Sequence, residues 1–218
     1  MSDTSAGTQR FEDHRWSTYR QEPVWRHRAA CRLVRKDPIV DVGGGDALLL
    51  SMLREAGWND LALADLSPVA VSIAKEAGFS AHVVDASQRL PFDDKSVGTA
   101  CALDVLEHLY DPRAVVLEMA RVADDVVIVV PNFHYWRERV QMLLGRIPFQ
   151  SRPQRGHVHW FNPLTLMALL DDTGLEPLEI LYESPVRLRQ LGRWLSTKWP
   201  AMFAASIGVR AAPIRRER

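Results

Sequence analysis

The sequence has 218 residues, of which 47% are hydrophobic and 25% charged, the balance of an ordinary soluble protein with one domain. Its 27 basic and 27 acidic residues cancel to a formal net charge of zero, so the charge pattern does not indicate nucleic-acid binding. The two cysteines lie far apart, and no leader or membrane-length apolar run is visible, which excludes a disulfide framework and predicts a cytoplasmic protein that contacts no membrane.

The chain opens with a segment that has a helical pattern on either side of Pro23. Seven β-rich runs follow, and helical patterns separate most of them. The earlier runs are apolar without strict alternation, which is typical of parallel strands covered by helices on both faces. The predicted strands are 39–43, 60–65, 80–85, 97–103, 125–130, 177–182 and 206–211. This order predicts an α/β domain built on a mostly parallel sheet.

Residues typical of helix starts mark the segments between these strands. Ser67, Asp111 and Asn162 each precede a proline, which pairs a good N-cap with a favoured first helical residue. A further helix is predicted from His134 to about Gly145, with an apolar stripe along one side. We expect this stripe to pack on another part of the protein.

Three consecutive glycines follow the first predicted strand, in PIVDVGGGDALLL at residues 38–50. Glycines permit backbone conformations and close approaches that a Cβ forbids, and the helix expected from about Ala47 presents free N–H groups at its start. A strand, a glycine turn and a helix in this order predict a nucleotide-containing ligand. A dinucleotide fingerprint has glycine where Leu48 stands, so the sequence favours S-adenosylmethionine over NAD without excluding NAD.

The stretch DVGGGDA resembles the first motif of class I S-adenosylmethionine-dependent methyltransferases, with Ala47 in place of the last glycine. Asp65, Asp85 and the run LPFDDKSVGTACALDVLEHLYDP at 90–112 follow in the family's order. The resemblance implies a Rossmann-like fold with a seven-stranded sheet, S-adenosylmethionine as cofactor and S-adenosylhomocysteine as product. It places Asp65 at the ribose and Asp85 at the adenine. The cofactor-binding residues that it implies are Asp41, Gly43, Gly44, Gly45, Asp65, Leu66, Asp85, Ala86 and Asp104.

After the fifth predicted strand, the sequence resembles the MetW group of methionine biosynthesis. The runs VIVVPNFHYWRERVQMLLGRIPFQ and HVHWFNPLTLMALLDDTGLEPLE carry this resemblance, and AMFAASIGVRAAP resembles the last strand of type 11 methyltransferases. Two functions are implied: a methyltransferase, or a cofactor-binding partner that supports a homoserine O-acyltransferase. We expect a single domain with a helical cap (1–35), a cofactor-binding core (36–183) and a C-terminal helix and last strand (184–218).

Methyl transfer from a sulfonium is an in-line displacement, so a general base is needed only when the acceptor must lose a proton. His108, in LDVLEHL, is the catalytic residue that the resemblance implies. Other candidate bases are His134, Tyr135, His157 and His159. His157 and His159 also suit metal binding, but no third ligand is evident, so the sequence predicts no metal site. Asn132 either binds the substrate or caps the following helix.

The acceptor is expected to be a small molecule. No Asn/Asp-Pro-Pro-Tyr/Phe motif follows the fourth predicted strand, and no basic stripe suits an RNA substrate. Aromatic residues in the N-terminal segment, Trp16 among them, and after the fifth strand either line an apolar acceptor pocket or fill the core. The expected protein partners are an acyltransferase or a second copy of the chain.

Overall fold

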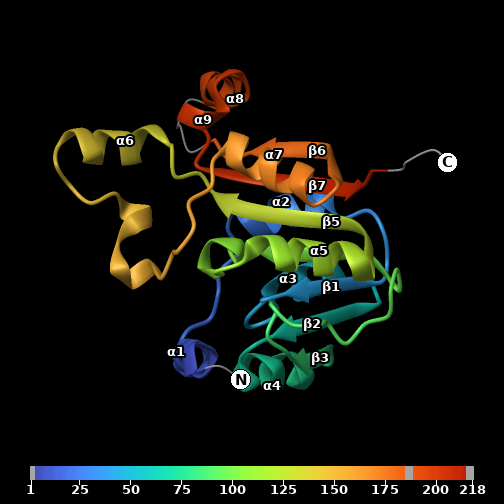
Figure 1. Ribbon diagram of the computed structural model, residues 1–218. Helices are drawn as coiled ribbons and strands as arrows, with labels where there is room; N and C mark the ends of the chain where they lie inside the picture. Colours follow the sequence, from blue (N-terminus) through green and yellow to red (C-terminus); the bar gives the residue numbers. More distant parts are fainter. Residues whose placement is uncertain (1–2, 185–188, 215–218) are drawn as a thin grey trace.

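The computed structural model describes residues 3–184 and 189–214. In these residues seven strands form one sheet in the order β3-β2-β1-β4-β5-β7-β6 (Figure 1). The strands are β1 (Ile39–Val42), β2 (Leu61–Asp65), β3 (Ser80–Val83), β4 (Val97–Leu103), β5 (Ala123–Pro131), β6 (Leu175–Tyr182) and β7 (Ser206–Pro213). Every strand predicted from the sequence is therefore present.

The sheet is mixed rather than mostly parallel, which corrects the expectation. The strands β3, β2, β1, β4 and β5 pair in parallel, whereas β7 pairs antiparallel with both β5 and β6. After β6 the chain passes through α8 (Arg189–Lys198) and α9 (Pro200–Phe203) and returns between β5 and β6. A strand's own hydrophobic pattern does not reveal where it inserts or in which direction it runs, so the sequence could not show this.

The helices begin where the sequence predicts. Ser67, Asp111 and Asn162 each accept a hydrogen bond from a backbone N–H of the first helical turn, as N-caps do. These three residues begin α4, α5 and α7. The described α-helices before α8 are α1 (Asp3–Thr18), α2 (Trp25–Leu33), α3 (Leu48–Glu55), α4 (Pro68–Glu76), α5 (Pro112–Val122), α6 (Trp136–Leu143) and α7 (Pro163–Asp172). No described helix combines the length and apolar character that crossing a membrane requires.

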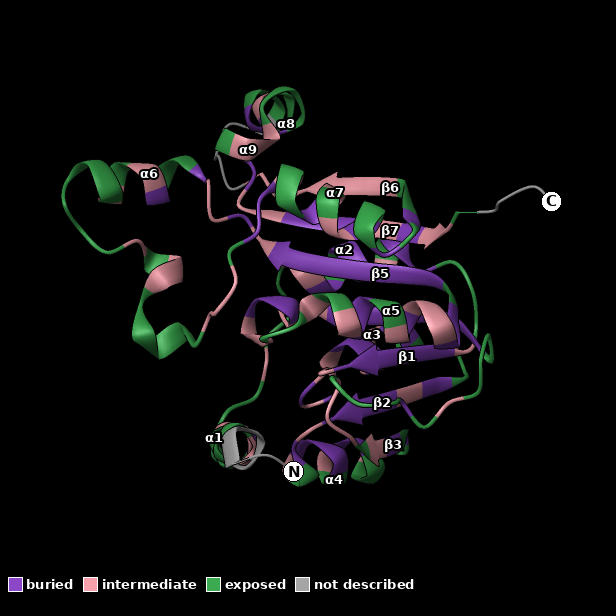
Figure 2. Cartoon of the chain, in the orientation of Figure 1, coloured by how far each residue is buried: buried purple, intermediate pink, exposed green. Residues whose placement is uncertain are grey.

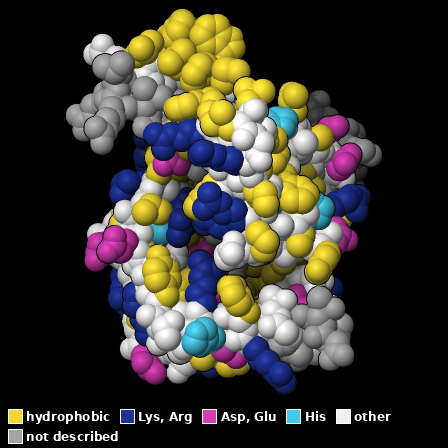
Figure 3. Space-filling view, turned by 90° about the vertical axis from the view of Figure 1, so that its left-hand side faces the viewer, with side chains coloured by type: hydrophobic (Ala, Val, Ile, Leu, Met, Phe, Trp, Pro, Cys, Tyr) yellow, Lys and Arg dark blue, Asp and Glu magenta, His cyan; other side chains and the backbone are white. Residues whose placement is uncertain are grey.

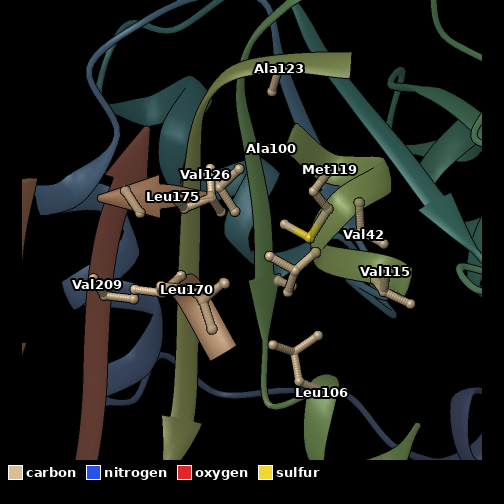
Figure 4. Close-up of a cluster of buried hydrophobic side chains, with 14 of the residues drawn as sticks. Val42, Ala100, Leu106, Val115, Met119, Ala123, Val126, Leu170, Leu175 and Val209 are labelled. Atoms are coloured by element: carbon tan, nitrogen blue, oxygen red, sulfur yellow. The ribbon is translucent and has the colours of Figure 1, made fainter. Parts of the chain in front are cut away.

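The core has two layers, one on each face of the sheet. The interior strand β5 is buried along most of its length (Figure 2), and its residues alternate between the two layers. Val126 and Ile128 pack with α5 and α7, and Met119 and Leu170 belong to that layer (Figure 4). Val127 packs in the layer formed with α2, α3 and α4. Helices therefore cover both faces, and the division into cap, core and C-terminal part stays a prediction.

The apolar stripe on α6 does not pack into this core. Tyr135, directly before α6, is 8% exposed, but the stripe's side chains on the helix are exposed, with Leu143 at 86%, Val140 at 40% and Trp136 at 37% of full exposure. They line an open groove of about 590 Å³ together with Met202 of α9. Figure 1 shows the reason, because α6 projects from the end of β5 away from the helices that cover the sheet.

Candidate functional site

The carboxyl ends of β1 and β4 lie side by side at the centre of the sheet, and the chain continues from them toward opposite edges. Such a switch point is where open α/β sheets bind ligands. The turns after the two strands touch, because a Cβ at Gly43 would lie 2.8 Å from Val105 Cγ2. These strand ends point toward the face shown in Figure 3. The candidate site therefore lies at this edge.

Each of the three predicted glycines is required by the geometry of the turn. Gly43 and Gly45 have φ values of +71° and +62°, in the left-handed region that favours glycine. A Cβ at Gly44 would lie 2.1 Å from Asp41 Oδ2. Ala47, which replaces the family's last glycine, also has a positive φ of 59° and is fully buried. The turn is thus held in a conformation that keeps backbone N–H groups close to the strand ends.

Asp65 connects the glycine turn to the end of β2. Its Oδ2 accepts a hydrogen bond from Gly45 N at 2.9 Å, and its Oδ1 accepts one from Ser67 N at 2.8 Å. The side chain is 5% exposed, and this burial raises its pKa against the lowering effect of the two N–H donors. A carboxylate has about four acceptor positions, so two remain for a ligand. Leu66 beside it is half-buried, and the Ser67 hydroxyl donates to Asp13 of α1.

Asp85 and Ala86 lie one strand further along the same edge. Strand β3 ends at Val83, so Asp85 belongs to the following turn rather than to the strand itself. Its Oδ1 accepts hydrogen bonds from Ser87 N and Ser87 Oγ at 3.0 and 2.6 Å. Val84 N donates to Asp65 O at 2.9 Å, which ties this turn to the end of β2. The structure thus brings the predicted adenine and ribose residues to neighbouring positions.

The N-terminal segment covers the glycine turn. Trp16 of α1 is 4% exposed, and its ring atoms would lie 2.3 Å from a Cβ on Gly45. Gln21 donates from its backbone N to Asp46 Oδ2 at 2.6 Å and from its Nε2 to Asp46 Oδ1 at 3.1 Å. Trp16 therefore lies on the glycine turn rather than in a separate aromatic pocket. No sequence signal pointed to Gln21 or Asp46, because their contact joins segments 25 residues apart.

Asp41 is buried behind the glycine turn, beside a cavity of about 10 Å³, which holds at most one water molecule. Among the described residues its Oδ1 has no hydrogen-bond partner. Burial, with the charge of Asp65 as a second cause, raises its pKa from 3.8 to about 8. Gln21 and His27 also line the cavity, so a ligand larger than water requires these residues to move.

Asp104 and His108 follow β4. Asp104 has a positive φ of 52°, and its Oδ2 lies 3.3 Å from Arg26 Nη1. His108 Nδ1 lies 3.2 Å from the carbonyl oxygen of Gly156. Because a carbonyl only accepts, Nδ1 must donate, which leaves the lone pair of Nε2 free. Burial lowers the pKa of His108, so the neutral imidazole is the prevailing form.

Other polar residues that the sequence singled out have structural partners. Asn132 is 1% exposed, donates from Nδ2 to Ala204 O at 2.8 Å and accepts from His134 N at 3.0 Å. Asn132 therefore joins the end of α9 to the turn before α6 and does not cap α6, whose N-cap is Tyr135. His134 Nδ1 lies 3.0 Å from the side-chain amide of Asn162. His159 Nε2 lies 3.2 Å from a backbone carbonyl oxygen, while His157 turns toward Glu107.

A family model described as a methyltransferase domain matches residues 11–180. The comparison with curated proteins found no match. Among solved structures, the chain is similar to an S-adenosylmethionine-dependent methyltransferase from Thermotoga maritima, with 14% identity, a TM-score of 0.65 and coverage of 97% of this chain and 96% of that one. It is also similar to the magnesium protoporphyrin IX methyltransferase from Synechocystis PCC 6803 with bound S-adenosylhomocysteine, with 16% identity, a TM-score of 0.63 and coverage of 97% and 100%.

At these identities the solved structures establish a shared fold. The family model covers most of the chain, from α1 to β6. By this match the chain belongs to the methyltransferase-domain family, with the α/β Rossmann-like fold of that family.

Proposed function

We propose that this chain is an S-adenosylmethionine-dependent methyltransferase with a small-molecule acceptor and S-adenosylhomocysteine as its second product. The observation that carries the proposal is Asp65 beneath the glycine turn. Its carboxylate fixes the turn through Gly45 N and keeps two acceptor positions, the number that a ribose diol needs. A Cβ at Gly45 would lie 2.3 Å from ring atoms of Trp16, so the turn, which lacks side chains, has room for the cofactor once Trp16 moves away. These residues therefore fit the cofactor.

The bound cofactor supplies a methyl group on a sulfonium, and the residues of this chain position it. Asp41 and the glycine turn, with Asp104 at the same edge, would hold the methionine part. Asp65 would hold the ribose, and Asp85 with the N–H of Ala86 the adenine. His108 Nε2, with its free lone pair, would take a proton from an acceptor that must lose one. Positioning for an in-line displacement supplies the rest of the rate.

Asp65→Ala should weaken S-adenosylhomocysteine binding about 10- to 150-fold, because charge-assisted hydrogen bonds contribute about 1.5–3 kcal/mol. Isothermal titration calorimetry measures the change, with NAD as the competing ligand class. Asp60→Ala is the matched control, because Asp60 directly precedes the opposite end of the same strand. Unchanged affinity in a folded Asp65→Ala protein would show that Asp65 does not bind the ribose. Tighter binding of NAD than of S-adenosylhomocysteine by wild type would show that NAD is the cofactor instead.

His108→Ala should slow the formation of S-adenosylhomocysteine by about 10²- to 10⁴-fold with an acceptor that loses a proton. Cofactor affinity should stay at the wild-type value, because His108 faces the acceptor rather than the nucleoside in this proposal. Added imidazole should restore part of the rate. Full turnover in the variant would show that His108 is not a base and that positioning of the cofactor and acceptor alone accounts for the rate.

A supporting role for an acyltransferase is the second candidate, and the exposed α6 stripe favours it. Val140 and Leu143 expose apolar surface beside an open groove, and such surface is typical of protein contacts. If the chain has this supporting role, it should co-purify with a homoserine O-acyltransferase or activate it. If it is the methyltransferase, the chain alone should convert S-adenosylmethionine to S-adenosylhomocysteine with an acceptor. Light scattering of the purified chain shows whether a second copy of the chain covers the stripe instead.

A further inference from the structure

Glu107, His108 and His157 form a cluster that the sequence did not reveal. Their potential ligand atoms all lie within 4.8 Å of one another. His157 Nε2 is 4.0 Å from Glu107 Oε1, and the two imidazole rings meet edge to face with their centroids 4.8 Å apart. Glu107 and His108 belong to the short 3₁₀ turn η1 (Leu106–His108), whereas His157 comes from the loop after α6.

Backbone hydrogen bonds hold the two segments together on both sides of His157. Val158 N and His159 N donate to the carbonyl oxygen of Glu107 at 2.8 and 3.0 Å. On the other side, His108 Nδ1 donates to Gly156 O at 3.2 Å. A hydrogen bond from the far ring nitrogen to a carbonyl is the contact that orients a metal-binding histidine. The cluster is therefore built in advance of any ligand.

Glu107 gives the independent indication that a cation belongs here. Its side chain is 1% exposed and its Oε2 has no hydrogen-bond partner in the described part of the chain. Within that part, no lysine or arginine nitrogen lies within 4.0 Å of it. The nearby Arg26 is paired with Asp104, and Arg155 acts on Glu107 only at longer range. A buried carboxyl oxygen without a hydrogen-bond partner is costly, and a bound cation would supply the missing partner.

We propose that Glu107, His108 and His157 bind a divalent transition-metal cation. Two imidazoles and one carboxylate are a ligand set that suits zinc and its neighbours among the divalent metals. Zinc ligands at about 2.0–2.2 Å lie roughly 3.4 Å apart, so the side chains need only small movements to close around the ion.

Three protein ligands leave a coordination position open. If the chain is the methyltransferase proposed above, that position lies where the acceptor would bind, and an oxygen or nitrogen of the acceptor could occupy it. The cation would then lower the acceptor's pKa so that the acceptor gives up its proton to solvent water, since a His108 that binds the cation no longer serves as the base. The substrate class implied is an acceptor that carries a metal-binding oxygen or nitrogen. This extension rests on the proposed function, whereas the metal site itself does not.

The test is calorimetric titration of chelator-treated protein with Zn²⁺, together with the visible absorption of Co²⁺ added in its place. Wild type should bind one ion, and His157→Ala and Glu107→Gln should each weaken binding on the order of 100-fold or more, since even outer-shell partners contribute 10- to 100-fold. His159→Ala is the matched control, because this neighbouring histidine lies outside the cluster and should bind zinc like wild type.

Two controls keep the outcome clear. Glu107→Gln keeps the size of the buried side chain and carries no charge, so the metal-free variant should melt no lower than wild type, and lost zinc binding then reports the site rather than unfolding. S-adenosylhomocysteine titration of the same proteins tests the proposed function separately, because it needs no metal. Absence of zinc binding in wild type, or an equal loss in His159→Ala, would overturn the metal site and leave cofactor binding untouched.

Discussion

The melting temperature of Asp41→Asn minus that of wild type should increase by about 10 °C between pH 5 and pH 8. Asp41 is 2% exposed with an unpartnered Oδ1 in the described structure, and burial raises its pKa from 3.8 to about 8. Between these two pKa values the folded protein holds a proton that the unfolded chain has lost. Wild-type stability therefore falls as the pH rises, by about 1.4 kcal/mol per pH unit.

From pH 5 to pH 8 this loss adds up to about 4 kcal/mol, and 1 kcal/mol moves the melting temperature of a protein of this size by about 2–4 °C. Asparagine does not ionise, so the stability of the variant lacks this dependence on pH. Any effect of the amide itself on the free energy of unfolding is the same at every pH and does not change the slope. Thermal melts by circular dichroism at several pH values measure the difference. Asp93→Asn, at an exposed turn, should follow wild type throughout. Parallel profiles for Asp41→Asn and wild type would show that Asp41 is ionised in the folded protein.

Local patterns in the sequence were enough for the elements of the fold. Strands appear as apolar runs, and helix starts such as Ser67 depend on residues three positions apart, so short segments determine both. Asp65 was predictable for the same reason, since its place at the end of a strand follows from local order. What the sequence could not give is the placement of β7 between β5 and β6, because strand order depends on contacts between distant segments.

The same limit applies to the site. Glu107 and His157 are 50 positions apart, and hydrogen bonds between their two segments, such as those from Val158 N and His159 N to Glu107 O, bring them together. The stripe on α6 shows the opposite error, because helical periodicity indicates an apolar face but not whether another element covers it. Leu143 is 86% exposed, so the periodicity was real while the expected packing was absent.

In the proposed cofactor site, Trp16→Ala should speed and tighten S-adenosylhomocysteine binding, because the indole ring lies against the glycine turn that the ligand must reach. Its ring atoms would be 2.3 Å from a Cβ on Gly45, so a nucleoside cannot contact this turn until the ring moves. Burying the indole also holds α1 in place, and Trp→Ala changes in cores cost about 3–5 kcal/mol. In wild type the ring must leave this packing before the ligand binds. The apparent affinity is therefore the affinity of the form with the ring displaced, multiplied by the fraction of molecules in that form.

Stopped-flow association and calorimetry measure the two effects, and limited proteolysis reports whether α1 has detached. Phe11→Ala is the matched control, since Phe11 is an aromatic residue of the same helix that is 60% exposed, and it should bind like wild type. Slower or weaker binding by Trp16→Ala would reverse the interpretation. The ring would then be part of the surface that holds the nucleoside, and α1 would close over the ligand rather than compete with it.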